Sequence, residues 1–262
     1  MGINGLNTFL KEKVPECIRE AHFSEFKGQK VAIDTSIYFY KFLYKNDRYI
    51  EGFFQQIYRL MSNGLLPVYI FDGIPPPEKK EIIEQRKEKK KILNKSIEEL
   101  ESKISSNVLG ETTLEEKDLL EKLKKKNIYV KKSYYDNLKH FLDLIGIPYL
   151  QCHEEADLLC NTLVLKNKVD LIMSDDMDIL VGGAKHILRN FNINNNKILF
   201  YDLNSIQKAL ELTEKQWVNL CILSGCDYCP RIPGVGVKNA YKFIQKNTLE
   251  EIKAQTIATV DL

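Results

Sequence analysis

Three short, largely apolar runs in this sequence each end at a carboxylate. Residues 31–33 precede Asp34, residues 66–71 precede Asp72, and the third run, 169–172, precedes an acidic cluster within residues 173–178. Segments with apolar residues at helical spacing separate the runs. This alternation of strands and helices predicts an α/β fold with a central, mostly parallel sheet flanked by helices. Ligands bind such sheets beyond the carboxyl ends of the strands, which is where Asp34 and Asp72 are expected to lie.

The acidic cluster contains Asp175, Asp176 and Asp178 within four residues. Like charges this close repel one another, and burial raises the pKa of at least one of these carboxyl groups. A hard divalent cation, which prefers oxygen ligands, would neutralise such a group. The alternative interpretation is an Asp-rich turn in which Asp178 caps a helix.

Further periodic segments extend the alternation. Residues 3–21 show helical apolar spacing at their start, and two strand patterns flank the polar turn 192–196, which predicts a hairpin. Gly64 is expected to end the helix before the second run. We expect helices over residues 37–44, 49–62, 134–144, 154–166, 205–210 and 214–223, and strands over residues 147–150, 186–191 and 197–201.

Residues 78–132 differ in composition, because they are rich in Lys, Arg and Glu and poor in aromatic residues. Two helices with narrow apolar stripes are expected there, and basic residues gather at 86–91 and 122–126. One interpretation is a solvated helical hairpin with ion pairs between successive turns. The other, compatible with the first, is an arm that lies over an anionic substrate.

The overall composition of the chain restricts the kinds of function that this protein can have. The net charge is +2 over 262 residues, so any nucleic-acid-binding surface must be local. The six Cys are scattered, which favours reduced thiols in an intracellular protein; a zinc site at the pair Cys226 and Cys229 is the alternative. No apolar run reaches membrane-spanning length, and no signal peptide opens the chain.

A glycine turn precedes the last helical pattern. Residues 232–238 include Gly234 and Gly236 between two helical segments, and Lys238 follows them. The free backbone N–H groups of such a turn can hold a phosphate, although any tight turn between helices favours glycine.

Six short stretches combine these features in a fixed order. They are Met1-Gly2-Ile3-Asn4-Gly5-Leu6, Val31-Ala32-Ile33-Asp34, Phe71-Asp72-Gly73-Ile74-Pro75-Pro76, Glu155-Ala156-Asp157, Ser174-Asp175-Asp176-Met177-Asp178, and Ser224-Gly225-Cys226-Asp227-Tyr228 followed by Gly234-Val235-Gly236. In this order they resemble the motifs of the structure-specific 5′ nucleases of the flap endonuclease/XPG family, within the PIN-like nucleases. One such motif would be weak, but six in register leave chance similarity a negligible alternative.

The resemblance implies a metal site with two Mg²⁺ ions, for which Mn²⁺ can substitute. Its carboxylates are Asp34, Asp72, Glu155, Asp157, Asp176, Asp178 and Asp227. Asp157 stands where flap endonucleases usually have Glu, whereas relatives in the 5′-exonuclease branch use Asp. Glu154 and Asp175 neighbour the motif positions and are not counted as ligands. Two ions about 3.5–4 Å apart can activate a water and neutralise the attacking and leaving oxygens of a phosphodiester.

The resemblance also implies residues that contact DNA. By spacing from the Asp72 motif, Lys79 and Arg86 fall on basic positions that contact the scissile phosphate, where a cation stabilises developing charge. Tyr40 matches an aromatic position that stacks on a base near the cut. Gly2, in the matching start of the chain, is assigned to the same DNA-binding set. The alternatives are ordinary surface cations and a core tyrosine.

A division of the chain follows from the same resemblance. Residues 1–262 form a single nuclease domain, with nuclease segments at 1–77 and 133–224. The family's helical arch, under or through which a free 5′ strand passes, corresponds to 78–132. A helix–hairpin–helix at 225–247 is expected to grip the duplex backbone through Gly234, Gly236 and Lys238, with K⁺ as a further bound ion.

We therefore predict a Mg²⁺-dependent, structure-specific 5′ nuclease that hydrolyses 5′-flap or otherwise branched duplex DNA in replication and repair. Within the family, the alternatives are a 5′→3′ exonuclease and a bubble or junction endonuclease. Outside it, the complete carboxylate set disfavours an inactive scaffold, and the glycine turn and arm disfavour an RNA-directed PIN nuclease. We expect a monomer in the nucleus. A sliding clamp is a further candidate partner, although no clamp-binding motif is found before Leu262.

Overall fold

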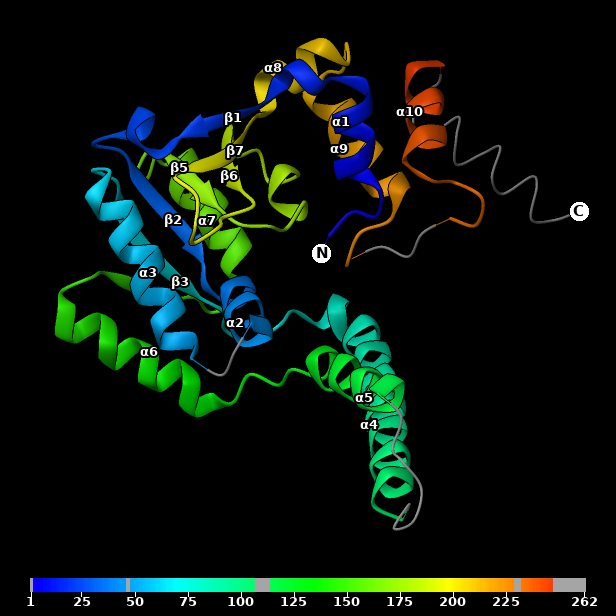
Figure 1. Cartoon of the computed structure of the whole chain (residues 1–262). Coiled ribbons are helices and arrows are strands. Elements are labelled where there is room, and N and C mark those ends of the chain that lie inside the picture. Colours follow the sequence, from blue (N-terminus) through cyan, green and yellow to red (C-terminus); the bar gives the residue numbers. More distant parts are fainter. Residues whose placement is uncertain (1, 46–47, 107–113, 229–231, 247–262) are drawn as a thin grey trace, which may run out of the picture.

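The computed structural model describes residues 2–45, 48–106, 114–228 and 232–246. In these ranges a seven-stranded sheet has the order β1-β7-β6-β5-β2-β3-β4 (Figure 1). Strands β6, β5, β2, β3 and β4 are parallel, and β7 is antiparallel to its neighbours β6 and β1. This sheet confirms the predicted fold class. The strands are β1 (Ile18–His22), β2 (Lys30–Asp34), β3 (Leu66–Phe71), β4 (Tyr149–Gln151), β5 (Leu171–Met173), β6 (His186–Arg189) and β7 (Lys197–Asp202).

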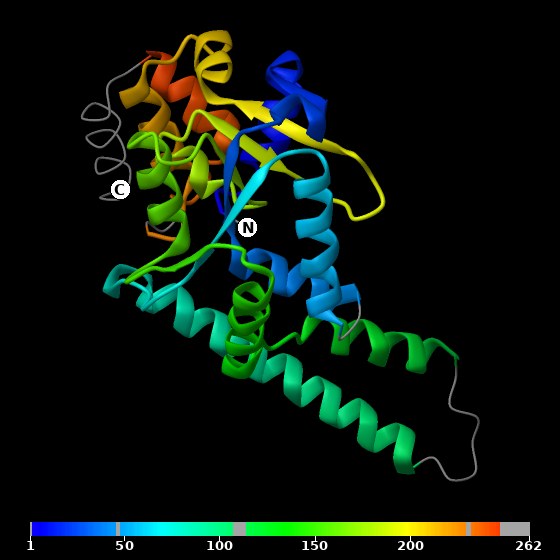
Figure 2. The same cartoon turned by 90° about the vertical axis from the view of Figure 1, so that its left-hand side faces the viewer.

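Helices cover both faces of the sheet (Figures 1 and 2). Each face has its own apolar core, one built around Phe39, Phe53 and Leu138 and the other around Leu10 and Trp217. On the first face lie α2 (Thr35–Lys45), α3 (Tyr49–Ser62) and α6 (Lys132–Ile145). On the second lie α1 (Leu6–Lys13), α7 (Ala156–Leu165), α8 (Leu203–Ala209), α9 (Glu214–Ser224) and α10 (Val237–Lys246).

Strand β2 is the centre of the arrangement that matters for function. Ala32 pairs with Val68 of β3 on one side and with Ile172 of β5 on the other, both in parallel register. Apolar residues fill these strands because both faces are covered by helices. The carboxyl ends of the three strands therefore lie side by side at one edge of the sheet.

Strand β1 is not predicted by the sequence pattern. Helix α1 ends at Lys13, and the chain then passes Pro15 and forms an edge strand in which Ile18 pairs with Tyr201 of β7. Most β1 side chains are exposed and polar, so no apolar alternation marks it. The predicted hairpin of β6 and β7 is confirmed, and Gly64, with φ +82°, follows α3 as expected.

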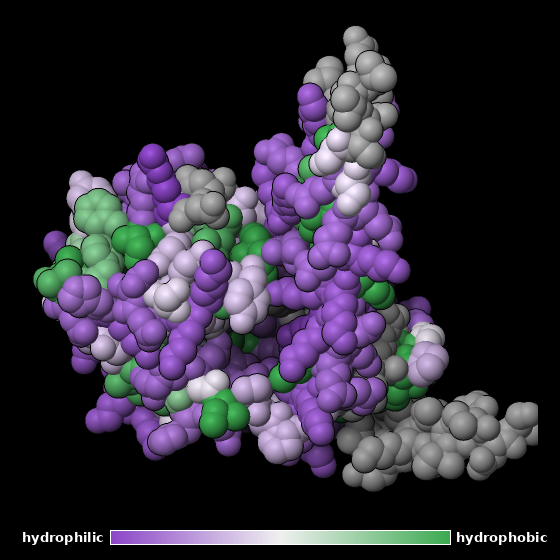
Figure 3. Space-filling model, turned by 90° about the horizontal axis from the view of Figure 1, so that it is seen from below, coloured by the Kyte–Doolittle hydropathy of each residue, from purple (hydrophilic) through white to green (hydrophobic). Residues whose placement is uncertain are grey.

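Helices α4 (Lys80–Ser106) and α5 (Leu114–Lys126) form a hairpin, called the arm below, that projects away from the sheet (Figure 1). This confirms the two helices expected within residues 78–132; the domain boundaries stay a prediction. Lys124 pairs with Glu101 across the hairpin, and Lys125 pairs with Glu121 along α5. The surface of the arm is predominantly hydrophilic (Figure 3), as the solvated-hairpin interpretation requires.

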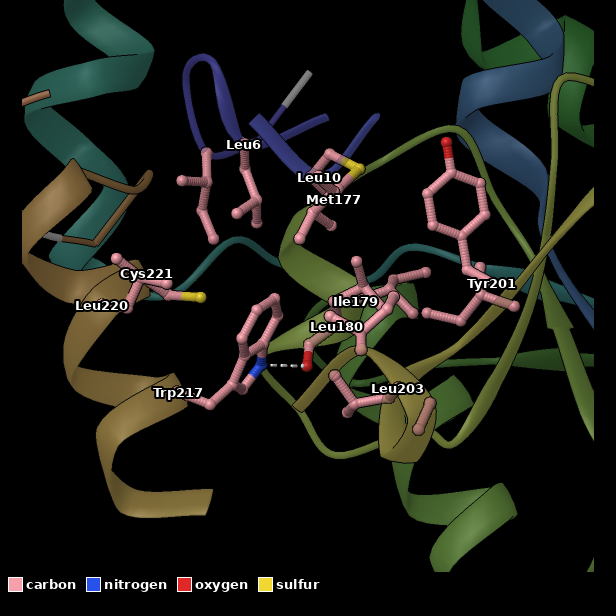
Figure 4. Packing of buried hydrophobic residues seen from close by; sticks show 14 of the residues in the cluster. Leu6, Leu10, Met177, Ile179, Leu180, Tyr201, Leu203, Trp217, Leu220 and Cys221 are labelled. Atoms are coloured by element: carbon pink, nitrogen blue, oxygen red, sulfur yellow. Dashed lines mark hydrogen bonds between the residues drawn. The ribbon is translucent and has the colours of Figure 1, made fainter. Parts of the chain in front are cut away.

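One buried contact links the second core to the acidic cluster. The Trp217 indole N–H of α9 donates a hydrogen bond of 3.0 Å to the Leu180 carbonyl (Figure 4). Leu180 ends the 3-10 turn η4 (Asp178–Leu180), which begins at the cluster's last carboxylate.

Within the described ranges, no helix combines the length and apolarity that crossing a bilayer requires.

Candidate active site

Three neighbouring strands deliver carboxylates to one edge of the sheet. Asp34 is the last residue of β2, and Asp72 immediately follows β3. The acidic cluster follows β5, with Asp178 at the start of η4. Because β5, β2 and β3 are adjacent and parallel, these side chains meet, as their positions after the apolar runs predict.

A pocket of about 160 Å³ lies at this edge. Both cations predicted to contact phosphate, Lys79 and Arg86, line it together with Tyr40. Asp178 is buried beside it, with its backbone N–H donating to Asp176 Oδ1 at 3.1 Å. The remaining predicted metal-site carboxylates all line the pocket, namely Asp34, Asp72, Glu155, Asp157, Asp176 and Asp227.

Helix α7 supplies two of the carboxylates from its N-terminus. Glu155 is the N-cap residue and Asp157 lies in the first turn, where the helix dipole favours negative charge. The Ala156 N–H donates to Asp72 Oδ1 at 2.7 Å, so α7 and the loop after β3 are joined at the pocket. Burial, followed by the charge of Glu155, raises the pKa of Asp157 to about 6.

Hydroxyl groups orient the two strand-end carboxylates. Ser174 Oγ donates to Asp34 at 2.9 Å, and Ser36 Oγ donates to Asp72. Asp34 is only 6% exposed, and burial together with the charge of Asp72 raises its pKa well above the usual range. The pocket therefore favours a proton or a metal cation on these groups.

The acidic cluster sends its side chains to different partners. Asp175 forms an ion pair of 2.8 Å with Lys41 and accepts a hydrogen bond of 2.6 Å from the Asn190 N–H. Asp176 lines the pocket. Both Asp178 oxygens are buried, and no described residue donates a hydrogen bond to them. Asp178 caps no helix, so that alternative is wrong.

Gly2 packs directly against this cluster. Its φ of +80° is a left-handed conformation that favours glycine. A Cβ atom there would lie 2.1 Å from Asp176 Oδ1 and 2.8 Å from the Asp178 backbone nitrogen. The structure thus places Gly2 at the carboxylate site, where only a residue without a side chain fits.

The base of the arm brings two cations to the carboxylates. Lys79 Nζ lies 2.7 Å from Glu155 Oε2, and Arg86 Nη2 lies 2.6 Å from Asp227 Oδ2. The Arg86 side chain is 54% exposed, whereas that of Lys79 is 9% exposed. Burial opposes the Lys79 charge, but the hydrogen bond with Glu155 and the surrounding carboxylates outweigh it and raise the pKa of Lys79. Lys79 and Arg86 therefore both form ion pairs with carboxylates of the pocket, whereas an ordinary surface cation needs no such partner.

The remaining DNA-contact candidates lie on two elements. Tyr40 of α2 is 40% exposed on the pocket wall and so is not a core tyrosine. Gly234 has φ +77° in the turn before α10, and the Gly236 carbonyl accepts the first hydrogen bonds of that helix. Lys238 forms an exposed ion pair of 2.5 Å with Glu12 of α1.

Profiles of two known domains match the chain. The XPG N-terminal domain matches residues 1–92, and the XPG I-region matches residues 146–227. Flap endonuclease 1 of Zea mays is 33% identical over 271 residues, which cover 96% of this chain and 69% of the relative. Flap endonuclease 1 of Homo sapiens is 34% identical over 270 residues, with coverages of 96% and 68%. The chain belongs to the flap endonuclease/XPG family.

Solved structures agree with this membership. The catalytic core of Rad2 in complex with DNA substrate has a TM-score of 0.74 and 27% sequence identity, and the match covers 97% of this chain and 72% of that one. As a member of the family, the protein is a hydrolase, a structure-specific 5′ nuclease that acts on DNA. The resemblance seen in the sequence motifs is therefore confirmed.

Nucleases of this family depend on metal ions, and the pocket fits a cation. Both buried oxygens of Asp178 accept no hydrogen bond from the described residues, and buried Asp34 accepts one from Ser174 but keeps a raised pKa because of burial and the charge of Asp72. No three His, Cys, Asp or Glu side chains in the described ranges are arranged as direct ligands of one ion. Glu155 and Asp227 pair with Lys79 and Arg86, and Asp72 accepts a hydrogen bond from Ser36. Mg²⁺ keeps several of its waters, so carboxylates that reach it through water also suit this site.

Two residues near the nuclease site receive no role from the sequence: Tyr228, which lies within a quoted motif, and Arg189, which lies outside any. Tyr228 lies under Lys79, with Nζ 4.4 Å from the ring centroid, and its hydroxyl donates to Glu155. Arg189, at the end of β6, contacts the acidic cluster from within the protein. A charged residue closing an apolar strand pattern is the only signal that could have singled out Arg189.

Cys229 of the alternative zinc pair and residues 247–262, where a clamp motif was sought, lie outside the described residues.

A pH-dependent stability is expected from Asp178. Burial, followed by the charge of Asp176, raises the pKa of Asp178 to about 7. The native state therefore binds this proton more tightly than the unfolded chain, so the metal-free protein loses stability as pH rises from about 4 to about 7. Asp178→Asn should raise the melting temperature by on the order of 5 °C at pH 8, and by about half as much at pH 5.5, in thermal melts with chelator.

The control for this measurement is Asp118→Asn, since Asp118 lies exposed on α5, away from the pocket. Its melting temperature should follow the wild type at both pH values. A shift of Asp178→Asn that is equal at pH 5.5 and pH 8 would contradict the titration of a buried carboxyl group.

Proposed function

We propose that this nuclease uses Mg²⁺ to hydrolyse phosphodiester bonds in DNA that carries 5′ flaps, nicks or free 5′ ends, in replication and repair. The observation that carries the proposal is the pocket in which six carboxylates meet Lys79 and Arg86. Carboxylates alone would suit a metal ion, and cations alone would suit a phosphate. Both together suit a phosphodiester held between metal ions and protein cations.

The seven carboxylates around the pocket are the residues proposed to hold the metal ions. Two ions held there would supply the chemistry of a nucleophilic water and of charge neutralisation at the phosphate. Ser36, Ser174 and the Ala156 N–H keep the strand-end carboxylates oriented toward the pocket. The set comprises Asp34, Asp72, Glu155, Asp157, Asp176, Asp178 and Asp227.

Lys79 and Arg86 are proposed to bind the scissile phosphate. Their present partners, Glu155 and Asp227, belong to the proposed metal site. If these carboxylates held metal ions, Lys79 and Arg86 would be available to the phosphate oxygens. A cation at this position stabilises the charge that develops during cleavage more than the charge of the bound substrate.

The arm is proposed to accommodate the free 5′ strand. A groove of about 460 Å³ between α2 and the arm is lined by Tyr40, Tyr44, Lys90, Lys125 and Lys126. Aromatic rings beside lysines suit single-stranded DNA, because bases stack on the rings and phosphates pair with the ammonium groups without regard to sequence. Tyr40 lines both this groove and the catalytic pocket, which makes it the proposed stacking residue at the cut.

The glycine turn is proposed to hold the duplex backbone, with K⁺ as a further bound ion. Gly234 takes the left-handed conformation of the turn ahead of α10, and Lys238 supplies a charge. Because the ion pair of Lys238 with Glu12 is exposed, exchanging Glu12 for a phosphate costs little. Such contacts position DNA without reading its sequence.

A substrate panel tests the proposed function. We expect cleavage of 5′-flap duplexes with Mg²⁺ and none with chelator, because the carboxylates need the ions to activate water. Nicked, blunt and bubble duplexes assayed beside the flap, with products sized on denaturing gels, separate a flap endonuclease from an exonuclease or a bubble endonuclease. Binding of every duplex without cleavage of any would instead indicate an inactive scaffold.

A further inference from the structure

Arg189 lies inside the protein against the acidic cluster, on the last residue of β6. It is 8% exposed. One terminal nitrogen, Nη2, donates to the Asp175 carbonyl, and the other, Nη1, contacts the Met177 sulfur. The guanidinium thus contacts the residues on either side of Asp176, whose own side chain faces the pocket.

The guanidinium is itself held from the other side. Nη1 donates to Asn7 Oδ1 of α1 at 3.2 Å, and the Tyr201 hydroxyl donates to the same oxygen at 2.7 Å. The Tyr201 ring lies 5.3 Å from the guanidinium carbon. Because α1 follows the segment in which Gly2 packs on Asp176, Arg189 ties both sides of the carboxylate cluster together.

Charge pairing does not explain this buried arginine. Among the ion pairs of the described residues, none involves Arg189, and Asp175 uses its carboxylate for Lys41 and the Asn190 N–H. A buried guanidinium without a carboxylate partner is costly. Arg189 instead contributes a planar guanidinium group, whose N–H donors hold several partner atoms in place at once. The flexible ammonium group of a lysine cannot do this.

We propose that Arg189 is a positioning residue for the metal site. It holds Asp175 and Met177, and so orients Asp176 and Asp178 for the cation. This inference rests on the proposed function, since it assigns Arg189 a role toward the proposed Mg²⁺ ligands. Groups that orient metal ligands commonly change metal affinity by about 10–100-fold when they are removed.

The test measures Mn²⁺ binding in the absence of DNA, by the electron paramagnetic resonance signal of free Mn²⁺. Arg189→Lys keeps the positive charge but removes the planar guanidinium group, so Mn²⁺ affinity should fall by about tenfold or more. The matched control is Arg59→Lys: Arg59 likewise donates to a backbone carbonyl, that of Ile193, and to the side chain of Asn196, but outside the site. Its Mn²⁺ affinity should equal the wild type.

Normal Mn²⁺ affinity in a folded Arg189→Lys protein would overturn the positioning role, as would an equal loss in Arg59→Lys. If Arg189→Lys does not fold, Asn7→Ala decides, because it removes the anchor of Nη1; it should weaken Mn²⁺ severalfold, and an unchanged affinity overturns the inference. Asp176→Ala separates the two proposals. If it leaves wild-type Mn²⁺ binding intact, the metal assignment itself fails and the role of Arg189 with it.

Discussion

Replacing Asp176 with alanine is expected to abolish cleavage of 5′-flap DNA while binding of the flap survives. Asp176 lines the pocket beside Asp34 and Asp72, and its loss removes a proposed metal ligand. Metal ions contribute several kcal/mol to such a reaction, and each 1.36 kcal/mol is a factor of ten, so the rate should fall by at least about 10³-fold. Single-turnover cleavage with Mg²⁺ and fluorescence anisotropy with chelator measure the two effects.

Asp175→Ala is the matched control for this experiment. Asp175 is the adjacent carboxylate, but it pairs with Lys41 and the Asn190 N–H. Its variant should keep most of the cleavage rate. Near-normal cleavage by Asp176→Ala would refute the proposed metal site, and equal losses in both variants would show that the two carboxylates are not distinguished by function.

The second large effect is expected from Arg86→Ala. Arg86 reaches the pocket from the arm and pairs with Asp227, and we propose that it stabilises charge on the scissile phosphate. Removing such a group typically lowers the rate by about 10²–10³-fold. Binding should weaken far less, because the other proposed DNA contacts, in the groove beside the arm and at the glycine turn, stay in place. Single-turnover rates and flap affinities measured on the same preparation provide the comparison.

Lys91→Ala controls for the charge of the arm. Lys91 lies on α4 like Arg86, but it is exposed and pairs only with Glu88 of the same helix among the ion pairs of the described residues. It should change neither rate nor affinity by more than a small factor. Equal losses of rate and affinity in Arg86→Ala would make Arg86 a docking charge rather than a catalytic residue.

Much of the fold could be predicted because its central strands are buried on both sides. Apolar runs such as residues 31–33 carry their own signal, and the segments between them show helical spacing over spans like 49–62. Strand β1 carries no such signal. Ile18–His22 is polar at the surface and becomes a strand only because β7 offers it a partner.

The candidate site was predicted in two unequal ways. Asp34 and Asp72 follow directly from apolar runs, so the geometry of parallel sheets places them together. Glu155, Asp157 and Asp227 were assigned only through the family resemblance, because a helix N-terminus and a loop after a helix carry no comparable signal. The structure brings all of them to one pocket, and their roles as metal ligands stay a prediction.

The sequence by itself determined where the strands end and that carboxylates stand at those ends, since periodicity is a local property of the chain. The family resemblance separates Asp175 from Asp176 and Asp178, but only the tertiary structure decided how these side chains are oriented. Asp175, Asp176 and Asp178 are nearly equivalent as a sequence, yet Lys41 and Asn190 hold the first, whereas Asp176 faces the pocket. The physical reason is that side-chain directions in a loop depend on distant partners, here residues of α2 and the end of β6, which no local pattern contains.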